Sequence, residues 1–74
     1  MILRYTEHAR AKMSREGIAE WAIIAVITSP EWSQIGETAS EYRSRVAGFP
    51  LPLHVVLVAG RDPALVITVY WVDR

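Results

Sequence analysis

The chain has 74 residues, eight basic and eight acidic side chains, no net charge and no cysteine. This length suffices for one small domain over residues 1–74, and the composition excludes disulfides, cysteine-based zinc sites and the basic excess of general nucleic-acid-coating proteins. The two histidines, His8 and His54, are 46 positions apart, so neither a metal site nor another cofactor is indicated.

No stretch of the chain is typical of a membrane span or of a secretion signal. The longest apolar run, Trp21 to Ile27, is far shorter than the ~20 residues that cross a bilayer, and the first ten residues lack the apolar core of a signal peptide. Because cysteine is absent as well, we expect a soluble, cytoplasmic protein without membrane contact. A hydrophobic share of 51% is slightly high for so small a domain and predicts an apolar patch that meets a partner or a second copy.

The first predicted element is a helix over residues 7–16. Thr6 can cap its first turn by accepting a hydrogen bond from a free N–H, and Gly17 provides a left-handed stop. The spacing i, i+4 and i+7 places three candidate phosphate-binding side chains on one helix face: His8, Lys12 and Arg15.

A second helix is predicted over residues 20–28, although so short and apolar a run is also compatible with a buried strand. Its alanines, the acidic start at Glu20 and the stop at Ser29-Pro30 favour the helix. The run is apolar nearly all round, which indicates a contact surface for a partner protein or a second copy on its outer side, with Trp21 and Ile24 as contact residues.

Alternating and β-branched sequences then predict four strands, joined mainly by short turns, over residues 32–37, 41–46, 53–59 and 65–72. Two helices followed by four such strands indicate an α+β fold, with both helices packed on one face of a four-stranded antiparallel sheet.

The alternation also predicts which side chains lie on which face of the sheet. In the last strand the more apolar series should meet the helices: Leu65, Ile67, Val69 and Trp71. The more polar series should lie on the open face: Val66, Thr68 and Tyr70. Arginines cannot be buried without partners, so we assign Arg43 and Arg45 to the open face. We assign His54 to the same face, where it would lie with Thr68 and Tyr70.

A set of short motifs runs in order through nearly the whole chain, from Tyr5 to Trp71. The string HARAKMSREGI resembles the His-Ala-x-x-(Arg/Lys)-Met-x-x-(Arg/Glu)-Gly-Ile pattern of a bacterial family of small uncharacterised domains. Its members continue with a Tyr-Arg strand, a Val-rich strand and a Thr-Val-Tyr signature, matched here by Tyr42-Arg43, Val55 to Val58 and Thr68-Val69-Tyr70.

That family resembles the barnase/EndoU/colicin/RelE-type superfamily of ribonuclease toxins. The resemblance implies the layer order above, with RNA cleavage on the open face of the sheet and commonly an antitoxin partner, which would bind here through the apolar second helix. The chain departs from the family pattern at two places. Ala19 replaces the usual Ser before the second helix, which removes a cap of about 1 kcal/mol, and the turn before the Tyr-Arg strand is the blander GETAS.

Metal-independent RNA cleavage needs an acid/base group and cations that stabilise the charge on phosphate. Histidine titrates near neutral pH, and the planar guanidinium of arginine binds two phosphate oxygens at once. The residues and the resemblance together give three catalytic candidates: His8, Arg43 and Tyr70. Five further residues are RNA-binding candidates: Lys12, Arg15, Arg45, His54 and Thr68.

Each assignment has a structural alternative: a solvated cap for His8, edge protection for the strand arginines and ordinary packing for Tyr70. For the domain as a whole, the alternative to a ribonuclease is a non-catalytic protein-binding or homo-oligomerising module on the same fold. The apolar second helix and the zero net charge favour that alternative. A small-ligand pocket has no supporting motif.

Overall fold

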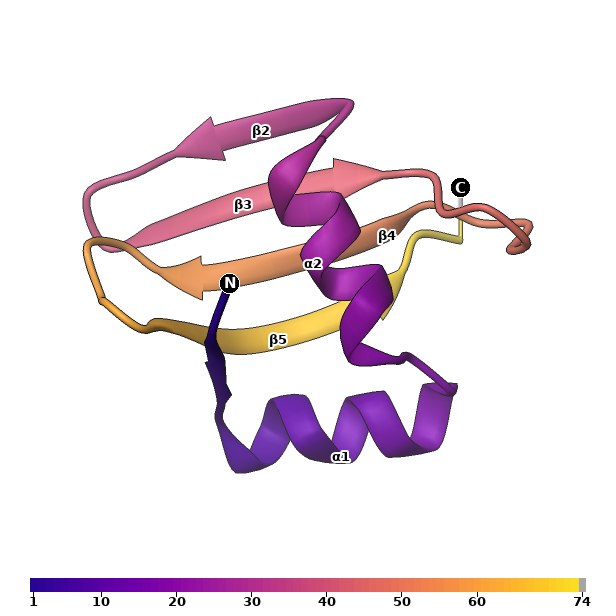
Figure 1. Cartoon of the computed structure of the whole chain (residues 1–74), viewed down its shortest axis with the longest axis horizontal. Coiled ribbons are helices and arrows are strands. Elements are labelled where there is room, and N and C mark those ends of the chain that lie inside the picture. Colours follow the sequence, from indigo (N-terminus) through magenta and orange to yellow (C-terminus); the bar gives the residue numbers. More distant parts are fainter. Residues whose placement is uncertain (74) are drawn as a thin grey trace.

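The computed structural model describes residues 1–73, which contain two helices and five strands (Figure 1). The elements follow one another in the order β1 (Leu3–Tyr5), α1 (Glu7–Glu16), α2 (Glu20–Thr28), β2 (Trp32–Ile35), β3 (Ala39–Ser44), β4 (Leu53–Val58) and β5 (Ala64–Trp71). The strands form one sheet in the order β1-β5-β4-β3-β2.

The sheet is mixed, and the predicted four-stranded antiparallel sheet is therefore wrong. The four later strands are antiparallel neighbours, but β1 adds a fifth strand that pairs in parallel with β5, from Leu3 opposite Ala64 to Tyr5 opposite Val66. Three residues are too few to display the alternation by which strands are recognised. The partner of β1 is also some 60 positions away in the sequence, so the pairing cannot be predicted from a local sequence pattern.

The first strand is held by the core and by α2. Leu3 is buried in the core, and the Tyr5 hydroxyl donates a hydrogen bond of 2.6 Å to the Glu20 carboxylate at the start of α2. Partial burial, together with that carboxylate, raises the pKa of Tyr5 well above its ordinary value. The phenol therefore stays protonated and remains a donor to Glu20 throughout the usual pH range.

The bounds of α1 confirm the predicted helix. Thr6 Oγ1 accepts a hydrogen bond of 3.0 Å from the Ala9 N–H and donates one of 2.9 Å to the Ile67 carbonyl, so the cap also attaches the helix to β5. Gly17 ends the helix at a φ of 67°, which is the left-handed conformation expected of a C-terminal glycine.

The two helices occupy different places on the sheet. Figure 1 shows α2 lying across the sheet, whereas α1 runs alongside β5. Helix α2 packs on β3 and β4, and helix α1 packs mainly on β5. The expectation that both helices cover one face is therefore replaced by one covering helix and one helix at the edge.

The main core lies between α2 and the sheet. Its buried side chains come from α2, β4 and β5 and include Ala22, Ile23, Val26, Leu53, Val55, Leu57, Val66 and Val69. Fully burying a Val, Leu or Ile side chain contributes about 1.5–3 kcal/mol, so these contacts are the main source of stability. None of the helices in residues 1–73 is long and apolar enough to cross a membrane.

A β-bulge in β5 makes the predicted assignment of side chains to the two faces correct on one side of the bulge and wrong on the other. Val69 pairs with Val55 and Thr68 with Val56, but the next pair is Val66 with Leu57, so one additional residue lies in β5 between them. A bulge reverses the alternation beyond it. Val69 therefore faces the core as predicted, while Val66, predicted on the open face, is 0% exposed.

We predict that Ala19→Ser stabilises the protein. Ala19 is the N-cap of α2, has extended backbone and provides no side-chain acceptor, so a Ser Oγ there would accept from a free N–H and add about 1 kcal/mol to the free energy of unfolding. Urea denaturation measures the change. Ala25→Ser, at an exposed position inside the same helix, is the control and should instead lose up to about 0.7 kcal/mol. Equal effects of the two substitutions would contradict the missing cap.

Candidate functional site

A transverse row of four side chains crosses the open face of the sheet. The strand register places Trp32 of β2 opposite Arg43 of β3, Arg43 opposite His54 of β4, and His54 opposite Tyr70 of β5. Their neighbours Leu53 and Val55 point the other way, into the core. Glu41 lies two residues before Arg43 on the same face of β3. We call the row of four and Glu41 together, five residues in all, the His54 cluster.

His54 is only 1% exposed, and both of its ring nitrogens are hydrogen-bonded. Arg43 Nε lies 3.1 Å from His54 Nδ1, and His54 Nε2 lies 2.9 Å from a Glu41 carboxylate oxygen. An arginine Nε–H can only donate, so Nδ1 must be the acceptor and Nε2 must hold the proton that is donated to Glu41. The bonding pattern thus assigns a neutral imidazole with its hydrogen on Nε2.

Aromatic rings lie on both sides of this imidazole. The Trp32 ring centroid is 5.8 Å from that of His54, and the Tyr70 centroid is 5.0 Å from it on the other side. Both rings keep part of their surface in solvent, at 42% and 37% exposure. The Arg43 guanidinium lies 5.2 Å from the Trp32 ring centroid, a cation–π distance. The cluster therefore has two accessible aromatic rings and a cation that lies over one of them.

His8 reaches the margin of the same face from α1. Its Nε2 lies 3.0 Å from Thr68 Oγ1, and Thr68 precedes Tyr70 by two residues on β5, so both side chains lie on one side of the sheet. His8 is exposed. Within residues 1–73 its other ring nitrogen has no hydrogen-bond partner, so His8 retains a nitrogen that can exchange a proton with a ligand.

Arg45 does not share the environment of Arg43. Its guanidinium contacts the Glu31 carboxylate at 3.0 and 3.3 Å, and its backbone N–H donates to the same carboxylate at 2.9 Å. These hydrogen bonds lower the pKa of Glu31 below its ordinary value and raise that of Arg45. The predicted pair of phosphate-binding arginines is therefore divided into Arg43, which is in the cluster, and Arg45, which is engaged by Glu31.

The remaining predicted cations stay on α1. Lys12 is partly buried and lies 3.8 Å from the Glu16 carboxylate, one helical turn further along the chain. Arg15 is exposed in the last turn. Neither residue belongs to the His54 cluster, and both follow His8 along the helix that runs beside β5.

Two members of the cluster were missed by the sequence analysis as site residues: Trp32 and Glu41. The signal for Glu41 was present, because it alternates with Arg43 and so shares its face of β3. The place of Trp32 depends on the pairing of β2 with β3, and a tryptophan beside an apolar helix is more simply interpreted as a core residue.

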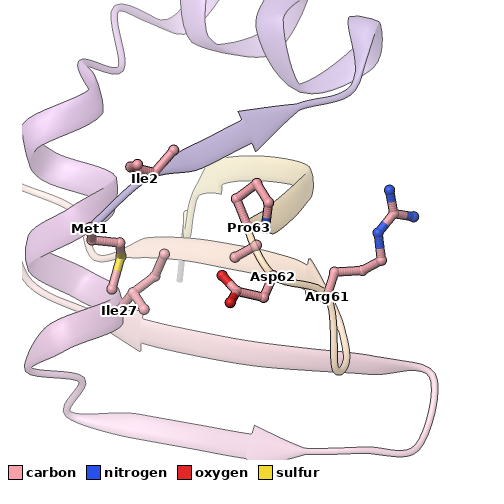
Figure 2. Close-up of a pocket in the computed structure, with 7 residues that line it drawn as sticks. Met1, Ile2, Ile27, Arg61, Asp62 and Pro63 are labelled. Carbon is pink, nitrogen blue, oxygen red and sulfur yellow. The ribbon is translucent and has the colours of Figure 1, made fainter.

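Two hollows of the surface lie away from this cluster. A cavity of about 720 Å³ opens between the start of β1, the end of α2 and the turn before β5. Figure 2 shows its apolar side chains, including Met1 and Ile27, and an Arg61 that extends away from them. A smaller one of about 170 Å³ includes Phe49 and Trp71. Neither hollow includes a residue of the His54 cluster.

Side chains in residues 1–73 do not form any group of three or more His, Cys, Asp or Glu placed to hold a metal ion.

Comparison with known proteins identifies one protein-family model that matches the chain, described as a domain of unknown function (DUF4258), over residues 5–71. No curated protein and no solved structure matches the chain. The match covers the same span as the motifs from Tyr5 to Trp71, but the description names no activity and no kinship with ribonucleases. That kinship stays a prediction.

We predict that Arg45→Gln raises the pKa of Glu31 towards its ordinary value. A carboxyl whose folded-state pKa is lowered adds stability above its unfolded pKa and loses that stability as the pH falls through the folded pKa. The variant should therefore show a smaller loss of stability on acidification below about pH 5. Carboxyl NMR titration and urea denaturation at several pH values measure both effects. Arg15→Gln is the control, and an unchanged Glu31 titration in Arg45→Gln would contradict the assignment.

Proposed function

The chain belongs to this DUF4258 family, and we propose that it binds single-stranded RNA on the open face of its sheet and cleaves it by general acid/base chemistry. The observation that supports this proposal most strongly is the His54 cluster, in which two exposed aromatic rings lie on either side of the buried imidazole and a cationic guanidinium lies over one of these rings. The family resemblance seen in the sequence motifs supports the same function.

RNA recognition is the first part of the proposal. Unpaired bases stack on exposed aromatic side chains, and a nearby arginine binds the phosphate between them. Trp32 and Tyr70 provide the two rings, and Arg43 provides the cation. Its Nε is bonded to His54, whereas its two terminal nitrogens have no hydrogen bond within residues 1–73. Because the chain has no net charge, affinity would depend on this local arrangement rather than on a general basic surface.

Cleavage is the second part. In metal-independent cleavage, the 2′-oxygen attacks phosphorus while its proton goes to a base, the bond to the 5′-oxygen breaks, and that oxygen takes a proton from the protonated base or from water. His8 is the acid/base group, because it is exposed and has a free ring nitrogen. Arg43 stabilises the charge that builds on the phosphate. His54, buried with both nitrogens occupied, takes no part in the proton transfer.

A second candidate function is that of a protein-binding or self-associating module. Trp21 on α2 is 55% exposed, and its ring lies 6.2 Å from that of Phe49. Ile24, the other predicted contact residue, is half-buried and packs against the core. The apolar surface around Trp21 is separate from the His54 cluster, so it is compatible with the ribonuclease proposal as the place where an antitoxin or a second copy would bind.

We predict that Arg43→Gln weakens binding of single-stranded RNA at least tenfold, because a hydrogen bond to a charged group contributes about 1.5–3 kcal/mol. Trp32→Ala should weaken it by a similar factor through lost stacking, which is worth about 1–3 kcal/mol per base. Fluorescence anisotropy with a labelled mixed-sequence RNA at low salt measures both. Arg45→Gln removes the same charge at a site engaged by Glu31 and should change the affinity less than about threefold. Equal losses for Arg43→Gln and Arg45→Gln would contradict the assignment of the site.

We predict that the protein cleaves RNA in the presence of a metal chelator, and that His8→Ala lowers the rate about 10²–10⁴-fold, the range for losing a general acid or base. Gel analysis of a mixed RNA pool measures cleavage, and growth arrest on expression in bacteria gives a second readout. The control is Arg10→Gln, a charge change at another exposed position of α1, which should leave the rate unchanged. Intact RNA at a stoichiometric amount of wild-type protein would exclude cleavage, and harmless expression of a protein that elutes as a dimer would favour the second candidate.

A further inference from the structure

We propose that His54 is a positioning residue: held by Glu41 with its proton on Nε2, it accepts a hydrogen bond from Arg43 Nε and so directs the guanidinium towards a ligand phosphate. This inference rests on the proposed RNA-binding function and assigns a role to the two cluster residues that do not contact the ligand. Its basis is the continuous chain of bonds from Glu41 through His54 to Arg43, at 2.9 and 3.1 Å.

An arginine on an open sheet face is otherwise free to adopt many rotamers. Ordering such a side chain costs rotamer entropy, and the binding energy of a ligand has to offset this cost unless the protein has already ordered the side chain. In this domain two contacts hold the side chain before any ligand arrives. Nε is bonded to His54, and the guanidinium lies over the Trp32 ring. The two terminal nitrogens then remain available for two phosphate oxygens.

Glu41 is needed because a neutral imidazole has two tautomers. With the proton on Nδ1, the Nδ1–H and the Arg43 Nε–H would face each other as two donors at 3.1 Å. A carboxylate at Nε2 favours the tautomer with the proton on that nitrogen. Glu41 Oε1 is in this place, so its carboxylate leaves Nδ1 with a free lone pair for Arg43.

Burial makes the arrangement rigid. His54 is 1% exposed, and Trp32 and Tyr70 lie on either side of its ring. Water therefore cannot readily replace Nδ1 as the acceptor for Arg43. The same rings that would stack on bases also hold the imidazole in place, which connects the positioning of the cation to the stacking surface.

Two substitutions of His54 separate positioning from packing. In His54→Asn the amide oxygen comes close to the place of Nδ1 and can accept from Arg43, whereas in His54→Gln the amide reaches the place of Nε2 and can bond Glu41 instead. We expect His54→Asn to keep the affinity for the mixed-sequence RNA within about threefold of wild type. His54→Gln should lose at least tenfold, like Arg43→Gln. Thermal denaturation of each variant verifies that it is folded.

A role in packing alone predicts the reverse order, because Gln is closer to His in volume than Asn is. Equal losses in the two variants, or a larger loss in His54→Asn, would therefore overturn the inference. If both variants unfold, the decisive measurement is made on the wild-type protein. Long-range ¹H–¹⁵N NMR spectra of its imidazole should show the Nε2–H tautomer, and an Nδ1–H tautomer or a protonated ring at neutral pH would overturn the inference as well.

The failure of this inference can be distinguished from the failure of the proposed function. If wild-type protein binds RNA and both variants bind equally well, RNA binding stands and positioning by His54 is excluded. If wild-type protein does not bind RNA, the proposed function and the role of His54 towards phosphate both fail. The Nε2–H tautomer would then remain only as a structural property of the sheet.

Discussion

The open face of this small sheet is organised by the need to satisfy one buried imidazole. His54 lies in the middle of β4, is 1% exposed and has two polar ring nitrogens, each of which would cost about 1–3 kcal/mol if left without a partner. Both partners come from the neighbouring strand, as Arg43 and Glu41. Since a shift of one residue would move every side chain to the other face, the register of β3 on β4 and the hydrogen-bonding of His54 support each other.

Hydrogen-bond partners also distinguish residues of the same type that look equivalent in the sequence. His54 has both nitrogens occupied and is sheltered by aromatic rings, whereas His8 is exposed and bonded through one nitrogen only. Arg43 is held by the imidazole with its terminal nitrogens open, whereas Arg45 is engaged by Glu31. In each pair only one member is suited to direct chemistry on a ligand. Which side chains of this face can act on a ligand thus depends on which of them are already hydrogen-bonded within the protein.

The arrangement of the helices separates two surfaces. Because α1 runs beside β5 and does not cover the open face (Figure 1), His8 reaches Thr68 at the margin of that face. Helix α2 covers the opposite face and presents Trp21 to solvent. A domain of this kind has room for a ligand on one side and for a protein partner on the other. The proposed RNA site and the apolar surface around Trp21 can therefore be occupied together.

What the sequence determined by itself is local. The cap at Thr6, the left-handed stop at Gly17 and the alternation of β3 depend on neighbouring residues, so both helices and the common face of Arg43 and His54 were predictable. Tertiary structure alone decided the parallel β1, the bulge that turns Val66 into the core, and the partners of Arg43, Arg45 and His54. These features join residues that are distant in the chain. Strand register and helix placement decide which of several chemically equivalent partners a side chain contacts, and no short sequence pattern encodes either of them.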